Sequence, residues 1–168
     1  GLTGKRFFVS DLGGGGWTPG YHIDQSRWIT AHLPISCYAA RSFPGKNKKN
    51  SVIYGGIDLA RYPMREHFGH DGSVVFLGRI LPHKGIHFLI DGLPAGIALK
   101  VIGSIGNQAY YEDLLAKSKG RLVTFLSGLS DNEVKKHLRT AMALVHPTPV
   151  NKLGDAGVNE LFGLAVVE

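Results

Sequence analysis

Residues 73–92, which read SVVFLGRILPHKGIHFLIDG, decide the fold of this chain. The first six residues form a short apolar run that is typical of a buried strand, and a helical pattern runs from Gly85 to Gly92. Between them lies a loop with two basic residues, Arg79 and Lys84. A strand, a polar loop and a helix in so short a stretch predict one β-α unit of a parallel sheet.

The same alternation continues toward the C-terminus. We expect further strands at residues 98–103, 121–127 and 141–147, and helices at 108–118, 131–140 and 160–168. Ser130 and Glu133 have the spacing of a capping box, which places the start of one helix at Asp131. Four β-α units in a row predict an α/β fold, a doubly wound, Rossmann-like parallel sheet with ligands outside the carboxyl ends of its strands.

The first third of the chain is less regular. A buried strand is expected at residues 5–10, short strands at 27–32 and 51–54, and a short helix at 35–43. The polar stretch 58–71 separates this part from the β-α units. We therefore place a domain boundary at residues 60 and 61. The chain has no initiator Met and ends inside an apolar helical pattern, so we interpret it as a piece of a longer protein, incomplete at both ends.

Composition narrows the classes of function. Of the 168 residues 43% are hydrophobic, which suffices for a core, and the formal charge of +6 favours anionic partners. The single cysteine, Cys37, excludes an internal disulfide and a cysteine-based zinc site, and it suggests a reducing compartment. No apolar stretch approaches the ~20 residues that span a bilayer. We expect a cytoplasmic protein that is soluble, or peripheral at the inner membrane surface.

Arg79 and Lys84 are the first candidates for ligand binding. Both follow the strand at residues 73–78, where a planar guanidinium and a lysine point charge can reach one anion such as a diphosphate. The alternative is that both are ordinary solvent-facing residues. The order of a P-loop is absent, and no Gly-x-Gly-x-x-Gly follows a strand. Gly103 and Gly106 are interpreted as allowing a tight turn from strand to helix.

Glu160 and Glu168 end the segment ELFGLAVVE and are the second candidates. On one helix they would lie about 12 Å apart along the axis and about 80° apart around it. That distance is too long for a cooperating acid/base pair of the glycoside hydrolase kind, at about 5–9.5 Å. It suits the two ends of an elongated, hydroxyl-rich ligand. Gly163 would let backbone N–H groups approach a phosphate or sugar oxygen. Taken alone, two surface glutamates are an equal alternative.

Three motifs together resemble the C-terminal half of family 4 glycosyltransferases, which are retaining enzymes of the GT-B fold. They are the phrase VIYGGID at residues 52–58, the strand-GR-x4-KG-helix unit, and the segment PTP…ELFGLAVVE. The likeness covers about residues 28–168. It implies that residues 1–60 are the end of an acceptor-side domain and a linker, and that residues 61–168 are a truncated nucleotide-sugar-binding domain.

The resemblance also implies roles for single residues. Arg79 and Lys84 would hold the donor diphosphate, Glu160 the transferred sugar and Glu168 the ribose hydroxyls, and the first three are the catalytic candidates. The other donor-binding residues would be Gly128 and Leu129 beside the base, and Phe162, Gly163 and Leu164. The polar insert 149–159 is longer than the loop usual in this family. Four histidines do not match the one that the family often places near the reacting carbon, and each is interpreted as structural or exposed: His22, His32, His83 and His146.

The predicted function is transfer of a sugar from a UDP-, GDP- or ADP-sugar to an acceptor hydroxyl, with retention of configuration and with no metal or organic cofactor. The acceptor could be a sugar, a lipid-linked sugar or a small molecule, and nucleic acid is not an expected partner. This stretch alone is expected to be inactive. The alternative is a non-catalytic module that binds a sugar nucleotide or another polyanion. A GT-B phosphorylase is a weaker third hypothesis.

Overall fold

The structure is a computed structural model that describes residues 6, 8–11, 30–37, 40, 51–62 and 69–148. The chain forms two compact units. One comprises residues 1–56 with 150–164, and the other comprises 57–149 with 165–168. The helix expected at 160–168 lies outside the described residues, together with its five candidate site residues, Glu160, Phe162, Gly163, Leu164 and Glu168.

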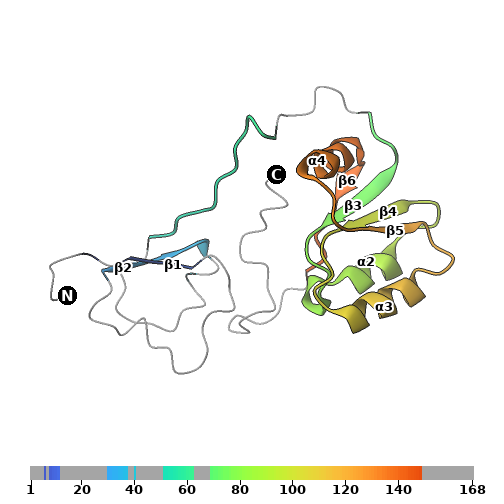
Figure 1. The fold of residues 1–168 in the computed structure, drawn as a ribbon, viewed down its shortest axis with the longest axis horizontal. Coiled ribbons are helices and arrows are strands. Elements are labelled where there is room, and N and C mark those ends of the chain that lie inside the picture. The colour runs from blue at the N-terminus through green and yellow to red at the C-terminus, as the bar shows by residue number, and fades with distance from the viewer. Residues whose placement is uncertain are drawn as a thin grey trace. The chain divides into compact units, whose positions relative to one another are not determined.

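In the first unit two short strands pair in parallel, β1 (Phe8–Asp11) and β2 (Ala31–Pro34), with Phe8 opposite Ala31 (Figure 1). The strands expected at residues 5–10 and 27–32 are thus present, but each extends further toward the C-terminus than its apolar run. The first was expected to be buried. Its Phe8 side chain is instead 52% exposed, because β2 covers only an edge of β1 among the described residues.

The strand expected at residues 51–54 is not formed, and this prediction is wrong. Residues 51–58 adopt no regular secondary structure, and Ile53 donates its N–H to the Pro34 carbonyl at 3.0 Å without continuing into a ladder. Neighbouring residues of a strand point to opposite faces. Ile53 and Tyr54 are both 56% exposed, so neither face has an apolar surface to cover it. The apolar residues of this segment are typical of a strand, but in this fold they are not buried.

The second unit confirms the α/β architecture. Its elements in chain order are β3 (Ser73–Leu77), the 3-10 helix η2 (Pro82–Lys84), α2 (Ile86–Gly92), β4 (Ala98–Ile102), α3 (Gln108–Lys117), β5 (Val123–Leu126), α4 (Asp131–Thr140) and β6 (Ala143–Leu144). The four strands form one sheet in the order β5-β4-β3-β6, and every neighbouring pair is parallel. The strand order reverses between β3 and β6, as in a doubly wound sheet.

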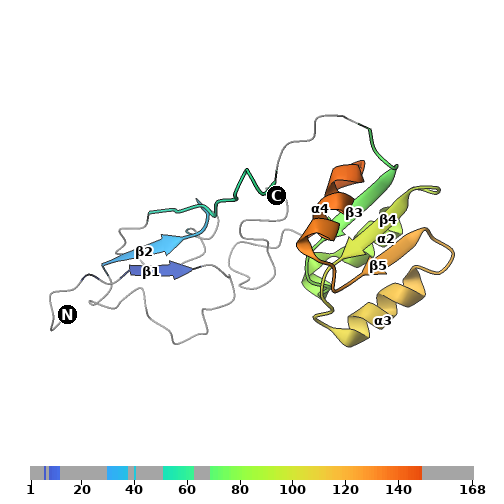
Figure 2. The same cartoon turned by 45° about the horizontal axis from the view of Figure 1, so that its top comes forward.

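Alternating side chains of β3 build a core on each face of this sheet. Val74 and Phe76 belong to a first core cluster, which also contains Ile86 and Ile90 of α2 and Leu114 of α3. The intervening Val75 packs on the other face, in a cluster that includes α4 side chains. Figures 1 and 2 show α2 and α3 together on one face and α4 on the opposite one. A strand with both faces covered must be apolar throughout, which explains the run SVVFL.

The ends of the elements follow local hydrogen bonds. The predicted capping box is present, since Ser130 accepts from the Glu133 N–H and the Glu133 carboxylate accepts from the Ser130 N–H. β5 and β6 are shorter than predicted. Arg121 donates its N–H back to Ser118 at 3.0 Å, and Ala141 donates to His137 at 3.1 Å. These bonds keep the first residues of both apolar runs in the preceding turns.

Candidate functional site

The candidate site lies at the carboxyl edge of the second unit's sheet. Because all four strands are parallel, the segments that follow them meet at one edge, where ligands of such sheets bind. These segments are residues 78–85 after β3, 103–107 after β4, 127–130 after β5 and 145–148 after β6. We call them the edge loops.

The loop that carries Arg79 is bonded to the loop after β4. Gly78 donates its N–H to the Ile102 carbonyl at 2.9 Å, and Ile80 donates to the Ser104 carbonyl at 2.9 Å. A further isolated bridge joins Ile80 to the residue before Gly106, so parallel pairing continues beyond the strands. The Ile80 side chain is only 1% exposed, whereas Arg79 is exposed. Because Ile80 is buried, the neighbouring Arg79 directs its guanidinium toward solvent at this edge.

Gly103 and Gly106 make this pairing possible. A Cβ on Gly103 would lie 1.9 Å from the Gly78 carbonyl oxygen, and a Cβ on Gly106 would lie 2.8 Å from the Leu81 side chain. Such separations are far below van der Waals contact. The two glycines thus do more than permit a tight turn. They let two edge loops approach each other with their backbones, which fixes the position of Arg79.

Lys84 ends the same loop. Pro82 starts η2 with its fixed φ angle, and Gly85 takes a φ of 72°, a left-handed conformation that connects η2 to α2. The first turn of α2 lacks a side-chain cap of its own. Tyr110 of α3 supplies one, since its hydroxyl oxygen accepts the His87 N–H at 3.2 Å and lies 2.8 Å from His87 Nδ1. Partial burial raises the pKa of Tyr110, so this cap stays neutral.

The edge loops have an unbalanced charge. They contain Arg79 and Lys84 and not one aspartate or glutamate. The nearest acidic residues in sequence, Asp131 and Glu133, start α4 and are already engaged. Asp131 pairs with Arg61, and hydrogen bonds from Ser130 hold the pKa of Glu133 below its usual value. The described part of this edge is therefore suited to an anion.

Gly128 and Leu129 occupy the loop after β5. Gly128 has a φ of 70° and is exposed, while Leu129 is half-buried against the α4 side of the core. β4 lies between β3 and β5, so this loop starts two strand spacings, or about 10 Å, from the loop that carries Arg79. The fold thus brings four predicted site residues, Arg79, Lys84, Gly128 and Leu129, to one edge. The other five lie outside the described residues.

The loop after β6 adds a histidine with a packing role. His146 is half-buried, its ring lies 5.9 Å from the Phe76 ring, and its Nδ1 is 3.0 Å from the Thr148 hydroxyl oxygen. This agrees with the interpretation of His146 as structural. Within the described residues no group of three His, Cys, Asp or Glu side chains could hold a metal ion. In the same part of the chain no helix has the length and apolar character needed to cross a membrane.

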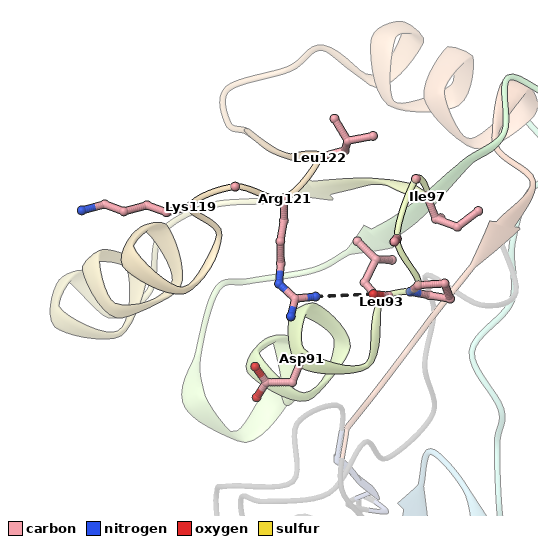
Figure 3. A pocket seen from close by; sticks show the side chains of 10 residues that line it. Asp91, Leu93, Ile97, Lys119, Arg121 and Leu122 are labelled. Atoms are coloured by element: carbon pink, nitrogen blue, oxygen red, sulfur yellow. Dashed lines mark hydrogen bonds between the residues drawn. The ribbon is translucent and has the colours of Figure 1, made fainter.

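A pocket of about 500 Å³ lies at the opposite, amino edge of the sheet, before β4 and β5. Figure 3 shows Arg121 reaching across it toward the end of α2. Its Nη1 donates to the carbonyls of Ile90 at 2.8 Å and Leu93 at 3.4 Å, and nearby Asp91 is paired with Lys117 at 2.8 Å. These charges complete the ends of α2 and α3. We therefore assign this pocket a structural role.

Sequence reasoning missed the backbone contact between the loops after β3 and β4. The signal was present, because the apolar runs FLG and VIG both end in glycine, at Gly78 and Gly103. Each glycine was interpreted by itself. The pairing needs the strand register, in which Leu77 lies opposite Ile102, so that the two glycines are partners.

Comparisons with known proteins agree with this fold. A family model described as glycosyl transferases group 1 matches residues 63–168. The crystal structure of AviGT4, a glycosyltransferase involved in avilamycin A biosynthesis, is similar with a TM-score of 0.64 at 20% sequence identity. The match covers 95% of this chain and 51% of AviGT4, so this chain spans about half the length of that protein. No curated protein matches.

Proposed function

Because this chain belongs to the glycosyl transferases group 1 family, we propose that it forms the donor-binding half of a retaining glycosyltransferase that uses a nucleoside-diphosphate sugar. The observation that carries the proposal is the charge of the edge loops, which hold Arg79 and Lys84 and no carboxylate. A diphosphate is the part of such a donor that needs cations. The distance of about 10 Å from this loop to the loop with Gly128 leaves room for the nucleoside beyond it.

The proposed reaction breaks the bond between the anomeric carbon and the diphosphate oxygen. The acceptor oxygen bonds to the anomeric carbon on the same face, and the acceptor's proton passes to the leaving diphosphate. Negative charge grows on the diphosphate as its bond breaks, so Arg79 and Lys84 stabilise the transition state more than the ground state. Glu160 would hold the sugar, and Glu168 the ribose. The proposal includes no metal or organic cofactor.

Kinetics of the complete protein test whether Lys84 stabilises the leaving diphosphate. Lys84→Ala should lower kcat by at least about tenfold, because a charge-assisted contact to the leaving group is lost. Lys119→Ala is the matched control, since Lys119 is an exposed lysine at the amino edge. It should keep kcat within about twofold. Equal kinetics for wild type and Lys84→Ala would remove Lys84 from the mechanism.

Calorimetry with UDP, GDP and ADP tests donor binding separately from turnover. One nucleotide should bind more tightly than the others, and Arg79→Ala and Glu168→Ala should each weaken it. Binding of duplex DNA that falls steeply with salt, without preference for a nucleotide, would indicate only a basic surface.

A non-catalytic sugar-nucleotide-binding module is the second candidate, because the cations of the edge loops, Arg79 and Lys84, suit the binding of an anion whether or not a reaction follows. Such a module would bind the nucleotide in calorimetry. The complete protein would then show no sugar transfer to any acceptor.

A further inference from the structure

A turn before the second unit's sheet contacts the start of α4. We call residues 58–62 the Asp58 turn. The Asp58 carboxylate accepts the Ala60 N–H at 2.9 Å. The Asp58 backbone carbonyl accepts the N–H groups of Arg61 at 2.9 Å and Tyr62 at 3.1 Å. An aspartate that bonds the backbone two residues on is a common way to fix a turn. The turn therefore has a defined shape that presents Arg61 and Tyr62 together.

Arg61 and Tyr62 both interact with side chains of α4. The Arg61 guanidinium pairs with the Asp131 carboxylate, and Arg61 Cζ also lies 5.9 Å from the centre of the Tyr62 ring. Lys135 Nζ lies 5.2 Å from the same ring. Residues four apart on a helix share a face, so Asp131 and Lys135 form one strip along the first turn of α4. The Asp58 turn packs along that strip by the ion pair to Asp131 and by one cation–π contact, from Lys135 to the Tyr62 ring.

The place where the turn is attached matters for the candidate site. Asp131 directly follows Ser130, the last residue of the edge loop 127–130 and the N-cap of α4. The other end of this loop is fixed to the sheet, because Gly103 donates its N–H to the Leu126 carbonyl at 2.9 Å. Between these ends lies the exposed Gly128. The position of the loop thus depends on β5 at one end and on the start of α4 at the other.

We infer that Arg61 and Tyr62 are positioning residues for the edge loop 127–130, and that they tune how tightly this loop holds a nucleotide base. The inference rests on the proposed function, which places the loop beside the base. The Arg61 and Asp131 side chains are 50% and 67% exposed, so the ion pair is weak by itself. Together with the cation–π contact of Lys135 it supports an effect of about fivefold on affinity.

The experiment measures KM for the nucleotide sugar, kcat, and the dissociation constants of UDP, GDP and ADP, all with the complete protein. Arg61→Ala and Tyr62→Ala should each raise KM by about three- to fivefold and keep kcat within about twofold. The preference for one nucleotide over the others should fall by a similar factor. A contact that merely stabilised the fold would lower the melting temperature and leave this preference unchanged.

Matched variants sharpen the test. Tyr62→Phe keeps the ring and should bind as the wild type does. Asp131→Asn should reproduce Arg61→Ala, and the double variant should be no worse than either single one, because both remove the same pair. Lys136→Ala, an exposed lysine on α4 outside this strip, should have no effect.

The outcomes separate the inference from the proposed function. If the wild type binds one nucleotide and Arg79→Ala weakens binding, while Arg61→Ala and Tyr62→Ala bind normally, the donor site stands and the inference is refuted. A wild type that binds none of the three nucleotides would overturn both.

Discussion

Gly103→Ala tests the backbone contact that fixes Arg79. The added methyl group would lie 1.9 Å from the Gly78 oxygen and 2.7 Å from the Gly78 carbonyl carbon. A carbon atom normally stays about 3.3 Å or more from an oxygen. The two loops must therefore separate by more than about 1 Å. A shift of that size breaks the 2.9 Å hydrogen bonds from Gly78 to Ile102 and from Ile80 to Ser104.

The magnitude follows from these losses. Two backbone hydrogen bonds contribute about 1 kcal/mol each, and the strained backbone at Gly103, with a φ of 155°, adds about 1–3 kcal/mol. We expect Gly103→Ala to lower the free energy of unfolding by about 3–5 kcal/mol. Urea unfolding followed by circular dichroism measures this change.

Gly72→Ala is the matched control for backbone conformation alone. Gly72 has a φ of 75° and no atom within 4 Å of its added Cβ, so only the left-handed conformation is penalised, by about 1–2 kcal/mol. If both variants lose the same free energy of unfolding, close approach of the loops is not what restricts residue 103 to glycine, and this explanation is refuted. A larger loss at Gly103, with weaker nucleotide binding, would support it.

Two further predictions concern polar groups of the second unit. Tyr110→Phe removes the acceptor for the His87 N–H and should lower the free energy of unfolding by about 1–2 kcal/mol in thermal denaturation, and no loss would mean that water replaces this cap. Hydrogen bonds from Lys100 and then from Ser73 hold the pKa of Asp71 well below its usual value. Since the folded pKa is lowered, Asp71 stabilises the fold above a pH of about 4, and this contribution is lost as the pH falls further. The melting temperatures of wild type and Asp71→Asn should therefore differ at neutral pH and converge in acid, and a difference that is constant with pH would contradict this role.

Much of the second unit could be predicted from sequence because local signals and burial agree there. The run SVVFL is apolar on both faces, and the capping box at Ser130 and Glu133 marks the start of α4 within the sequence itself. The segment SVIY carries the same strand signal, but it pairs with no strand in the part of the chain that the structure describes. Strand pairing depends on residues that are far away in the sequence. The residues of the segment alone could therefore not show whether it pairs.

The candidate site was predictable only in part. Basic residues after an apolar run indicate an anion site, and Arg79 and Lys84 do lie at the carboxyl edge. The contacts that hold this edge are made between loops, as between Gly78 and Gly103, or between helices, as between Tyr110 and His87. These pairs depend on strand register and helix packing, and a local sequence motif predicts neither of them.

The hydrogen bond from Arg121 to the Ile90 carbonyl joins residues that are 31 apart in the sequence. During synthesis α2 is therefore complete before the side chain that bonds its last carbonyls exists. A ribosome needs roughly two to six seconds to add that many residues. The buried members of the first core cluster lie between Val74 and Leu114, so all of them are synthesised before Arg121. Apolar contacts can hold the first β-α-β segment while the last carbonyls of α2 are still bonded to water. The guanidinium can replace that water only once Arg121 itself has been synthesised.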